Sequence, residues 1–167
     1  CDNLRSAEVV TADGRVLTAS ATSHPDLFWG LRGGGGNFGV ATGIDYALHP
    51  VGPEIVGGLV AWPISEAAAV LELYRTLAEQ APPELSLVML MRPAPPAPWL
   101  PPERHGKLMV ALLACHTGDP AEAEQLVAPI KAFGRPIGDV LVRRPYAQMQ
   151  GLLDATQPKG RRYYWKS

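Results

Sequence analysis

The chain has 167 residues with 15 basic and 16 acidic side chains, and its formal net charge at pH 7 is −1. This balance excludes the basic surface typical of proteins that bind nucleic acids or anionic membranes, so we expect no nucleic-acid partner and no membrane partner. The length allows one large hydrophobic core or two small ones, and the longest apolar stretch, residues 108–115, is too short to span a bilayer. The two cysteines, Cys1 and Cys115, form no disulfide framework and are expected to be free thiols.

Three strands are predicted in the first fifty residues. Residues 7–11 and 15–19 form a β-hairpin, because the Asp13-Gly14 pair between them is a strong signal for a two-residue turn. In residues 40–48, an apolar or β-branched side chain occupies every second position, which is the periodicity of a strand.

A short helix is predicted between the hairpin and the third strand. Apolar side chains recur at helical spacing over residues 27–31. Thr22 or Ser23 is the expected N-terminal cap. Pro25 falls near the first turn, where a proline is tolerated.

Four consecutive glycines, residues 33–36, follow this helix. A folded chain gives up side-chain packing in this way where its backbone must turn sharply or approach another group closely. Gly34, Gly36 and Gly39 also fit the G-x-G-x-x-G pattern of dinucleotide-binding proteins, which requires a strand before the glycines and a helix after them. Here a helix precedes the glycines and a strand follows them, so we do not predict a dinucleotide-binding turn of that kind.

A break in periodicity at residues 49–53 predicts a domain boundary, and we divide the chain into residues 1–52 and 53–167. The second part alternates between strands and helices. The predicted strands are residues 57–62, 85–92, 107–116 and 137–142, and the predicted helices are residues 67–78 behind a Ser65 cap, a helix from Asp119-Pro120 to a stop at Gly134, and a short helix over residues 145–153.

The order of these elements, strand–helix–strand–strand–helix–strand, is that of a ferredoxin-like unit. The predicted fold class is therefore α+β, with an antiparallel sheet that carries its helices on one face. Pro129 is expected to kink or shorten the second helix. Residues 93–102, which are rich in proline and include Trp99, separate the two middle strands.

Four segments of the sequence resemble the FAD-linked oxidases of the vanillyl-alcohol oxidase superfamily, in particular its berberine-bridge-enzyme-like branch. The two most specific segments are residues 8–17 and 26–40, in this order and at this spacing. Residues 1–4 and 163–167 extend the resemblance to both ends of the chain, the last of them with the weakest match.

The resemblance implies that residues 1–52 are the C-terminal part of a PCMH-type FAD-binding domain and residues 53–167 an incomplete ferredoxin-like substrate domain. It also implies an oxidoreductase that oxidises an alcohol, a sugar or a related secondary metabolite by hydride transfer to flavin, with reoxidation by molecular oxygen. Such a chain is expected to be an internal piece of a longer protein, to work with the remaining parts of its parent chain, and by itself to be inactive and to bind FAD weakly or not at all. Separately from the resemblance, we expect a cytoplasmic protein, with secretion as the alternative.

The resemblance further implies contacts to FAD from the residues around the glycine run. The candidate cofactor-binding residues are Asn3, Gly35, Gly36, Asn37, Gly39 and Val40. Each has an alternative role in the fold, since a glycine run also ends helices in a tight turn and Asn3 also suits a turn or a cap. We expect Phe38 to be a core residue.

The candidate substrate-binding residues are Tyr163, Tyr164 and Arg92, with Trp99 beside them. The alternative is that the two tyrosines belong to a strand whose alternate side chains pack beneath a sheet. No residue is assigned as the catalytic base. No metal site is predicted, because the histidines lack ligand spacing and Cys115 and His116, adjacent on a strand, face opposite sides.

A different class of function is also compatible with the pattern. A ferredoxin-like unit with an N-terminal hairpin extension could be a non-catalytic binding or interaction module, since this fold hosts many functions. This alternative does not account for the glycine run and its aromatic flanks.

Overall fold

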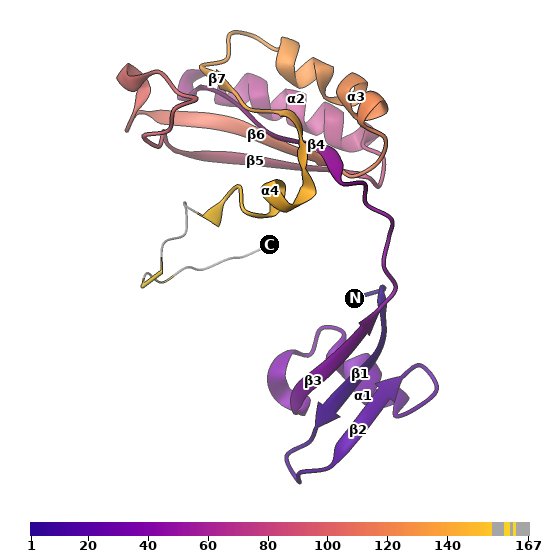
Figure 1. Cartoon of the computed structure of the whole chain (residues 1–167). Coiled ribbons are helices and arrows are strands. Elements are labelled where there is room, and N and C mark those ends of the chain that lie inside the picture. Colours follow the sequence, from indigo (N-terminus) through magenta and orange to yellow (C-terminus); the bar gives the residue numbers. More distant parts are fainter. Residues whose placement is uncertain (155–158, 161, 163–167) are drawn as a thin grey trace. The chain divides into compact units, whose positions relative to one another are not determined.

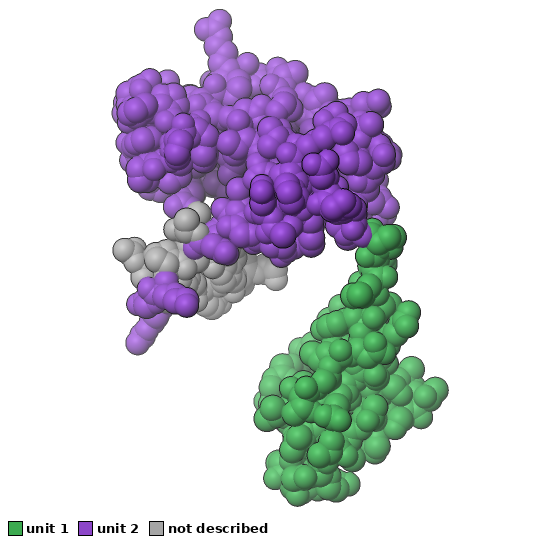
Figure 2. Space-filling view, viewed as in Figure 1, with its two compact units in different colours: residues 1–50 green, residues 51–167 purple. Residues whose placement is uncertain are grey.

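The computed structural model describes residues 1–154, 159, 160 and 162 of the chain. It divides the chain into two compact units, Cys1–Pro50 and Val51–Ser167 (Figure 2). The division falls two residues before the boundary drawn from the sequence. The assignment of the units to an FAD-binding and a substrate domain stays a prediction.

The first unit is a three-stranded antiparallel sheet with one short helix (Figure 1). The strands are β1 (Leu4–Val10), β2 (Val16–Ser20) and β3 (Val40–Tyr46), in the order β2-β1-β3. Helix α1 (Pro25–Leu31) and a 3-10 helix (Gly35–Phe38) connect β2 to β3. The predicted hairpin, helix and third strand are confirmed.

The hairpin turn lies one residue earlier than the sequence analysis placed it. The amide of Gly14 donates to the carbonyl of Thr11 at 2.9 Å, so Ala12 and Asp13 are at the centre of the turn. Gly14 follows them with φ +80°. Glycine is needed here because the residue after such a turn adopts the left-handed conformation.

The carboxylate of Asp13 stabilises this turn. It accepts hydrogen bonds from Thr11 Oγ1 and from Arg15 Nε, and these bonds lower its pKa from 3.8 to about 2. A lowered pKa in the folded state means that the ionised carboxylate stabilises the hairpin above pH 3.8 and that this contribution is lost as the pH falls towards 2. We expect NMR of the Asp13 carboxyl carbon to give a midpoint at about 2 and Thr11→Val to raise it. A midpoint of 3.8 in the native chain would contradict this interpretation.

The predicted caps of α1 are wrong. The N-terminal cap is His24, with φ 48°, and within the described residues its side chain makes no capping hydrogen bond. The amides of Thr22 and Ser23 are directed instead at Ser20 Oγ, from which they lie 3.3 and 3.1 Å away. The serine-threonine run therefore forms a turn ahead of the helix rather than its cap, and Pro25 occupies the first turn as predicted.

The second unit is an antiparallel sheet in the order β5-β6-β4-β7, with β8 also paired to β4. Its strands are β4 (Glu54–Pro63), β5 (Leu85–Pro93), β6 (Leu108–His116), β7 (Gly138–Asp139) and β8 (Val142–Pro145). Its helices are α2 (Ala67–Gln80), α3 (Pro120–Ala132) and α4 (Tyr146–Gln150), with two 3-10 turns at Ile64–Glu66 and Pro102–Arg104. The predicted ferredoxin-like order and α+β class are confirmed, although α4 is shorter than expected.

Helices α2 and α3 cover one face of this sheet, while α4 lies at the other face (Figure 1). The main core lies between the sheet and these two helices. It includes Val60 and Trp62 of β4, Val70 of α2 and Ile130 of α3, all fully buried. The opposite face has a smaller core around Leu59, Ala111 and the proline-rich segment, and we call it the open face.

Two helix predictions in this unit are corrected and one is confirmed. Ser65 lies in the 3-10 turn, and among the described residues no side chain caps α2, whose N-cap is Glu66. Asp119 caps α3 as predicted, with its carboxylate accepting from two backbone amides at 2.9 and 3.0 Å. Pro129 does not shorten α3, which continues to Ala132 because the proline removes only one donor in the last turn, and the alternative of a kink stays a prediction.

The single strand predicted for residues 137–142 is two short strands, β7 and β8, separated by Val140 and Leu141. The amide of Leu141 donates to Asp139 Oδ1 at 2.9 Å, which turns the backbone out of the ladder. On the adjacent strand, Gly58 has φ +142°, and a Cβ there would lie 2.0 Å from the carbonyl oxygen of Val140. Because Gly58 has no side chain, the backbone at Val140 can lie against it where the ladder is interrupted.

Within the described part of the chain, every helix falls short of the length and apolarity that a membrane crossing requires.

Candidate functional site

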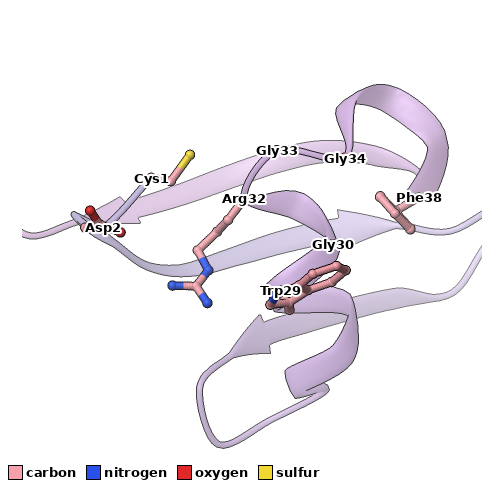
Figure 3. A pocket seen from close by; sticks show the side chains of 8 residues that line it. All are labelled: Cys1, Asp2, Trp29, Gly30, Arg32, Gly33, Gly34 and Phe38. Atoms are coloured by element: carbon pink, nitrogen blue, oxygen red, sulfur yellow. The ribbon is translucent and has the colours of Figure 1, made fainter.

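The first candidate region is a hollow of about 460 Å³ in the first unit (Figure 3). Residues from the N-terminus, from α1 and from the glycine run line it together, and they are Cys1, Asp2, Trp29, Gly30, Arg32, Gly33, Gly34 and Phe38. Trp29 leaves 75% of its surface exposed. The guanidinium carbon of Arg32 lies 4.9 Å from the ring centre of Phe28. The hollow therefore offers an aromatic surface beside a cation and exposed backbone.

Three of the four consecutive glycines are needed by the first unit itself. Gly33 and Gly35 have φ +145° and +68°, which other residues adopt only with strain. A Cβ on Gly34 would lie 2.4 Å from the ring of Phe38. Gly36 differs from all of them, because its φ is −80° and a Cβ there would meet no described atom within 4 Å.

The missing side chain of Gly36 is thus unexplained by the contacts of its own unit. A glycine in an ordinary conformation, facing open space, permits a group from outside the unit to approach the backbone closely. Gly36 is the position at which the glycine run is best suited to a ligand.

The second candidate region is a hollow of about 400 Å³ on the open face of the second unit. Leu59, Leu90, Met109 and Val140 of the sheet and its edge form its floor. Arg92, the proline-rich segment and residues 152–153 form its walls. The fold therefore brings Arg92 and Trp99 to one hollow.

A smaller hollow of about 280 Å³ adjoins it and shares Leu152 and Leu153 with it. Cys115 lines this second hollow, and partial burial raises the pKa of its thiol. A raised pKa reduces the thiolate fraction at neutral pH, so Cys115 is not activated as a nucleophile.

Many proteins have sequences related to this chain, and two of them illustrate the similarity. An FAD-linked oxidoreductase of Dictyostelium discoideum is 28% identical over 165 residues, which cover 98% of this chain and 33% of that protein. An FAD-dependent monooxygenase of Fusarium proliferatum is 43% identical over 84 residues, which cover 49% of this chain and 16% of that protein. No protein-family model matches the chain.

The crystal structure of 6-hydroxy-D-nicotine oxidase from Arthrobacter nicotinovorans matches the fold over 96% of this chain and 34% of its own, with a TM-score of 0.74 and 26% sequence identity. These matches support the resemblance of the chain to the FAD-linked oxidases of the vanillyl-alcohol oxidase superfamily. The resemblance inferred from the sequence is thereby confirmed. The chain spans about a third of the length of the proteins that it matches from end to end.

The six predicted cofactor residues do not line the first hollow, whereas their neighbours Asp2, Gly33 and Gly34 do. Several of the six have roles in the fold. The carbonyl of Asn3 accepts from the amide of Ala47 at 2.7 Å, and the Asn37 side-chain amide donates to the carbonyl of Gly34 at 2.8 Å. Their role in binding FAD stays a prediction.

Phe38 is more exposed than the sequence analysis expected for a core residue, and the candidate cofactor residue Val40 is exposed as well. Phe38 is 38% exposed, with its ring against Gly30 and Gly34, and Val40 is 67% exposed. The alternation in β3 predicted a strand correctly, yet within the described residues neither of its faces is buried.

The sequence analysis missed Trp29 and Arg32 as lining residues of the first hollow. A signal was available, because Trp29 follows the buried Phe28 and one residue along a helix turns the side chain away from the core. Tyr163 and Tyr164 lie outside the described residues. Among the described positions, no three histidine, cysteine or acidic side chains are grouped so that they could hold a metal ion.

Proposed function

We propose that the chain supplies part of the FAD site and the substrate-facing sheet of an FAD-dependent oxidoreductase. In this proposal, the first unit belongs to a PCMH-type FAD-binding domain and the second to the substrate domain. The substrate is a small molecule such as an alcohol, a sugar or a related secondary metabolite, and molecular oxygen is the final electron acceptor. The remaining parts of the parent chain complete the site, and the protein is cytoplasmic.

The observation that carries the proposal is the open space at Gly36. A side chain at this position would collide with nothing in its own unit, so its absence fits a flat cofactor that lies against the backbone. Names of related proteins also support FAD, since the matches from Dictyostelium and Fusarium are called FAD-linked and FAD-dependent. The name of the nicotine oxidase supports a small organic substrate.

The described residues have two tasks in this function. Asn37 holds the glycine turn through the carbonyl of Gly34, which presents the backbone of Gly36 outward in one conformation. The apolar open face of the second unit excludes water from a bound substrate. FAD, when bound, supplies a hydride acceptor, and the protein contributes position and electrostatics.

No proton-transfer residue is assigned in the second unit. The described residues that line the larger open-face hollow include no histidine, aspartate or glutamate. The guanidinium of Arg92 offers hydrogen-bond donors and no acceptor, so it is not a candidate for the base. A general base for this reaction is expected from another part of the protein.

The test is FAD binding by the complete gene product carrying Gly36→Leu. We expect at least about a 10-fold rise in the Kd of FAD, because the new side chain fills the space that the cofactor needs. The free energy of unfolding of the first unit should change by less than about 1 kcal/mol, since the replaced glycine has an ordinary φ and open surroundings. Flavin fluorescence quenching and urea unfolding measure the two quantities.

Gly43→Ala is the matched control, because a Cβ at Gly43 makes only an ordinary 3.6 Å contact with Glu8. It should leave the affinity for FAD unchanged. An unchanged Kd in Gly36→Leu would overturn the placement of FAD at this turn. A complete gene product that contains no flavin and binds none would favour the non-catalytic module instead.

A further inference from the structure

Arg92 is the only charged side chain among the described residues that line the larger open-face hollow. It lies on β5, where it pairs with Met109 of β6, and it shares its face of the strand with Leu90. Arg92 is thus half-buried, and the side chains that line the hollow around its guanidinium are apolar. Such a charge is costly to remove from water unless it finds a counter-ion.

Within the described part of the chain, the guanidinium of Arg92 makes no hydrogen bond and no ion pair, although the backbone of Arg92 belongs to the β5–β6 ladder. Arg143, on the helix-covered face, shows the contrasting arrangement, because its Nε lies 2.6 Å from Glu124 Oε1 and its second nitrogen 3.0 Å from Oε2. No described acidic side chain lines the hollow beside Arg92. The hollow therefore combines a positive charge with apolar walls and lacks an internal partner for that charge among these residues.

Trp99 forms a fixed aromatic wall of the same hollow. Its indole lies so close to Gly138 of β7 that a Cβ there would be 2.6 Å from the ring. The segment that carries Trp99 is anchored by Leu100, which is 3% exposed, and by the amide of Ala94, which donates to the carbonyl of Lys107 at 2.8 Å. The wall is thus preorganised for an apolar or aromatic ligand.

We propose that this hollow binds the carboxylate of a small aromatic or aliphatic acid, with the carboxylate on Arg92 and the apolar body against Trp99. One guanidinium matches the single charge and the two oxygens of a carboxylate, whereas a phosphate dianion would leave one charge uncompensated. The volume of about 400 Å³ suits a ligand of one to three rings. This inference rests on the proposed function and identifies the substrate class of the oxidoreductase.

The test compares 2-naphthoate with its neutral amide, 2-naphthamide, by calorimetric titration of the complete gene product. We expect the acid to bind at least about 10-fold more tightly, since the amide cannot form the charge-assisted pair. Arg92→Gln should abolish this preference, and Arg92→Lys should retain part of it. In Trp99→Leu, both ligands should lose affinity by a similar factor, because the aromatic wall contacts their common ring system.

Arg75→Gln is the matched control, because Arg75 lies on α2 and pairs with Glu72 at 3.4 Å. It should leave both affinities unchanged. NMR should show a shift of the Trp99 indole N–H on addition of 2-naphthoate and none for the buried Trp62 indole. Equal binding of acid and amide, or tight binding of the acid to Arg92→Gln, would overturn the proposal. Tighter binding of 2-naphthyl phosphate than of 2-naphthoate would overturn the assignment to a carboxylate.

These measurements need neither FAD nor turnover, so the two proposals can fail separately. If a gene product without flavin bound the acid in an Arg92-dependent manner, the proposed carboxylate site would stand and the proposed oxidoreductase function would be overturned. If the gene product contained flavin but oxidised only neutral compounds and did not bind 2-naphthoate, the proposed oxidoreductase function would stand and the proposed carboxylate site would be overturned.

Discussion

Replacement of Trp62 by alanine is expected to lower the free energy of unfolding of the second unit by about 3–5 kcal/mol. The side chain is fully buried between the sheet and the two covering helices. Its indole Nε1 donates to the carbonyl of Phe133 at 2.9 Å, and the two rings meet edge to face at 6.0 Å. Alanine would leave both a cavity and an unpaired carbonyl.

Urea unfolding followed by far-UV circular dichroism measures this change. Trp29→Ala is the control of the same chemistry, because Trp29 is 75% exposed and its loss should cost less than about 1 kcal/mol. Trp62→Phe separates the two contributions, since it retains much of the volume and loses the hydrogen bond. A cost below about 1 kcal/mol for Trp62→Ala would show that this contact does not hold the helices on the sheet.

Replacement of Gly39 by valine is expected to destabilise the first unit by about 3 kcal/mol or more. Gly39 has φ +135°, a conformation that a β-branched residue adopts only with strain. Its Cβ would also lie 2.4 Å from the carbonyl oxygen of Val10 and 2.9 Å from a methyl group of the buried Val9. Since β1 is the central strand, the clash displaces β3 from the sheet.

Hydrogen exchange of the β1 amides measures this effect within the first unit. We expect loss of protection along β1 in Gly39→Val and native protection in Gly36→Ala, although both changes fall in the same glycine-rich segment. Equal protection in the two variants would contradict the distinction between a glycine needed by the fold and a glycine facing open space.

The order of the elements in both units could be predicted from the sequence. Alternation in residues 40–48 and helical spacing in residues 27–31 are local properties, and β3 and α1 formed where this periodicity indicated. Capping was less predictable. Asp119 caps α3 because its side chain reaches two free amides, whereas Ser65, Thr22 and Ser23 lie in turns that orient them differently.

The candidate sites could be predicted only in part. Arg92 and Trp99 were selected as separate residues, and they line one hollow because residues 93–102 fold back over the open face. Trp29 and Arg32 were missed because periodicity does not show that the N-terminus, distant in sequence, joins them in one hollow. The substrate and cofactor roles of all these residues stay predictions.

The four glycines show where local information ends. Their position between a helix and a strand already indicated a bend, because only glycine allows the backbone conformations that such a bend needs. The tertiary structure decided which glycine the fold needs. The pairing of β1 with β3 places backbone and side-chain atoms beside Gly39, and the ring of Phe38 lies beside Gly34. Among the described residues, a Cβ at Gly36 would meet no atom within 4 Å. Periodicity is a property of neighbours along the chain, whereas the space around a backbone is filled by residues from distant segments.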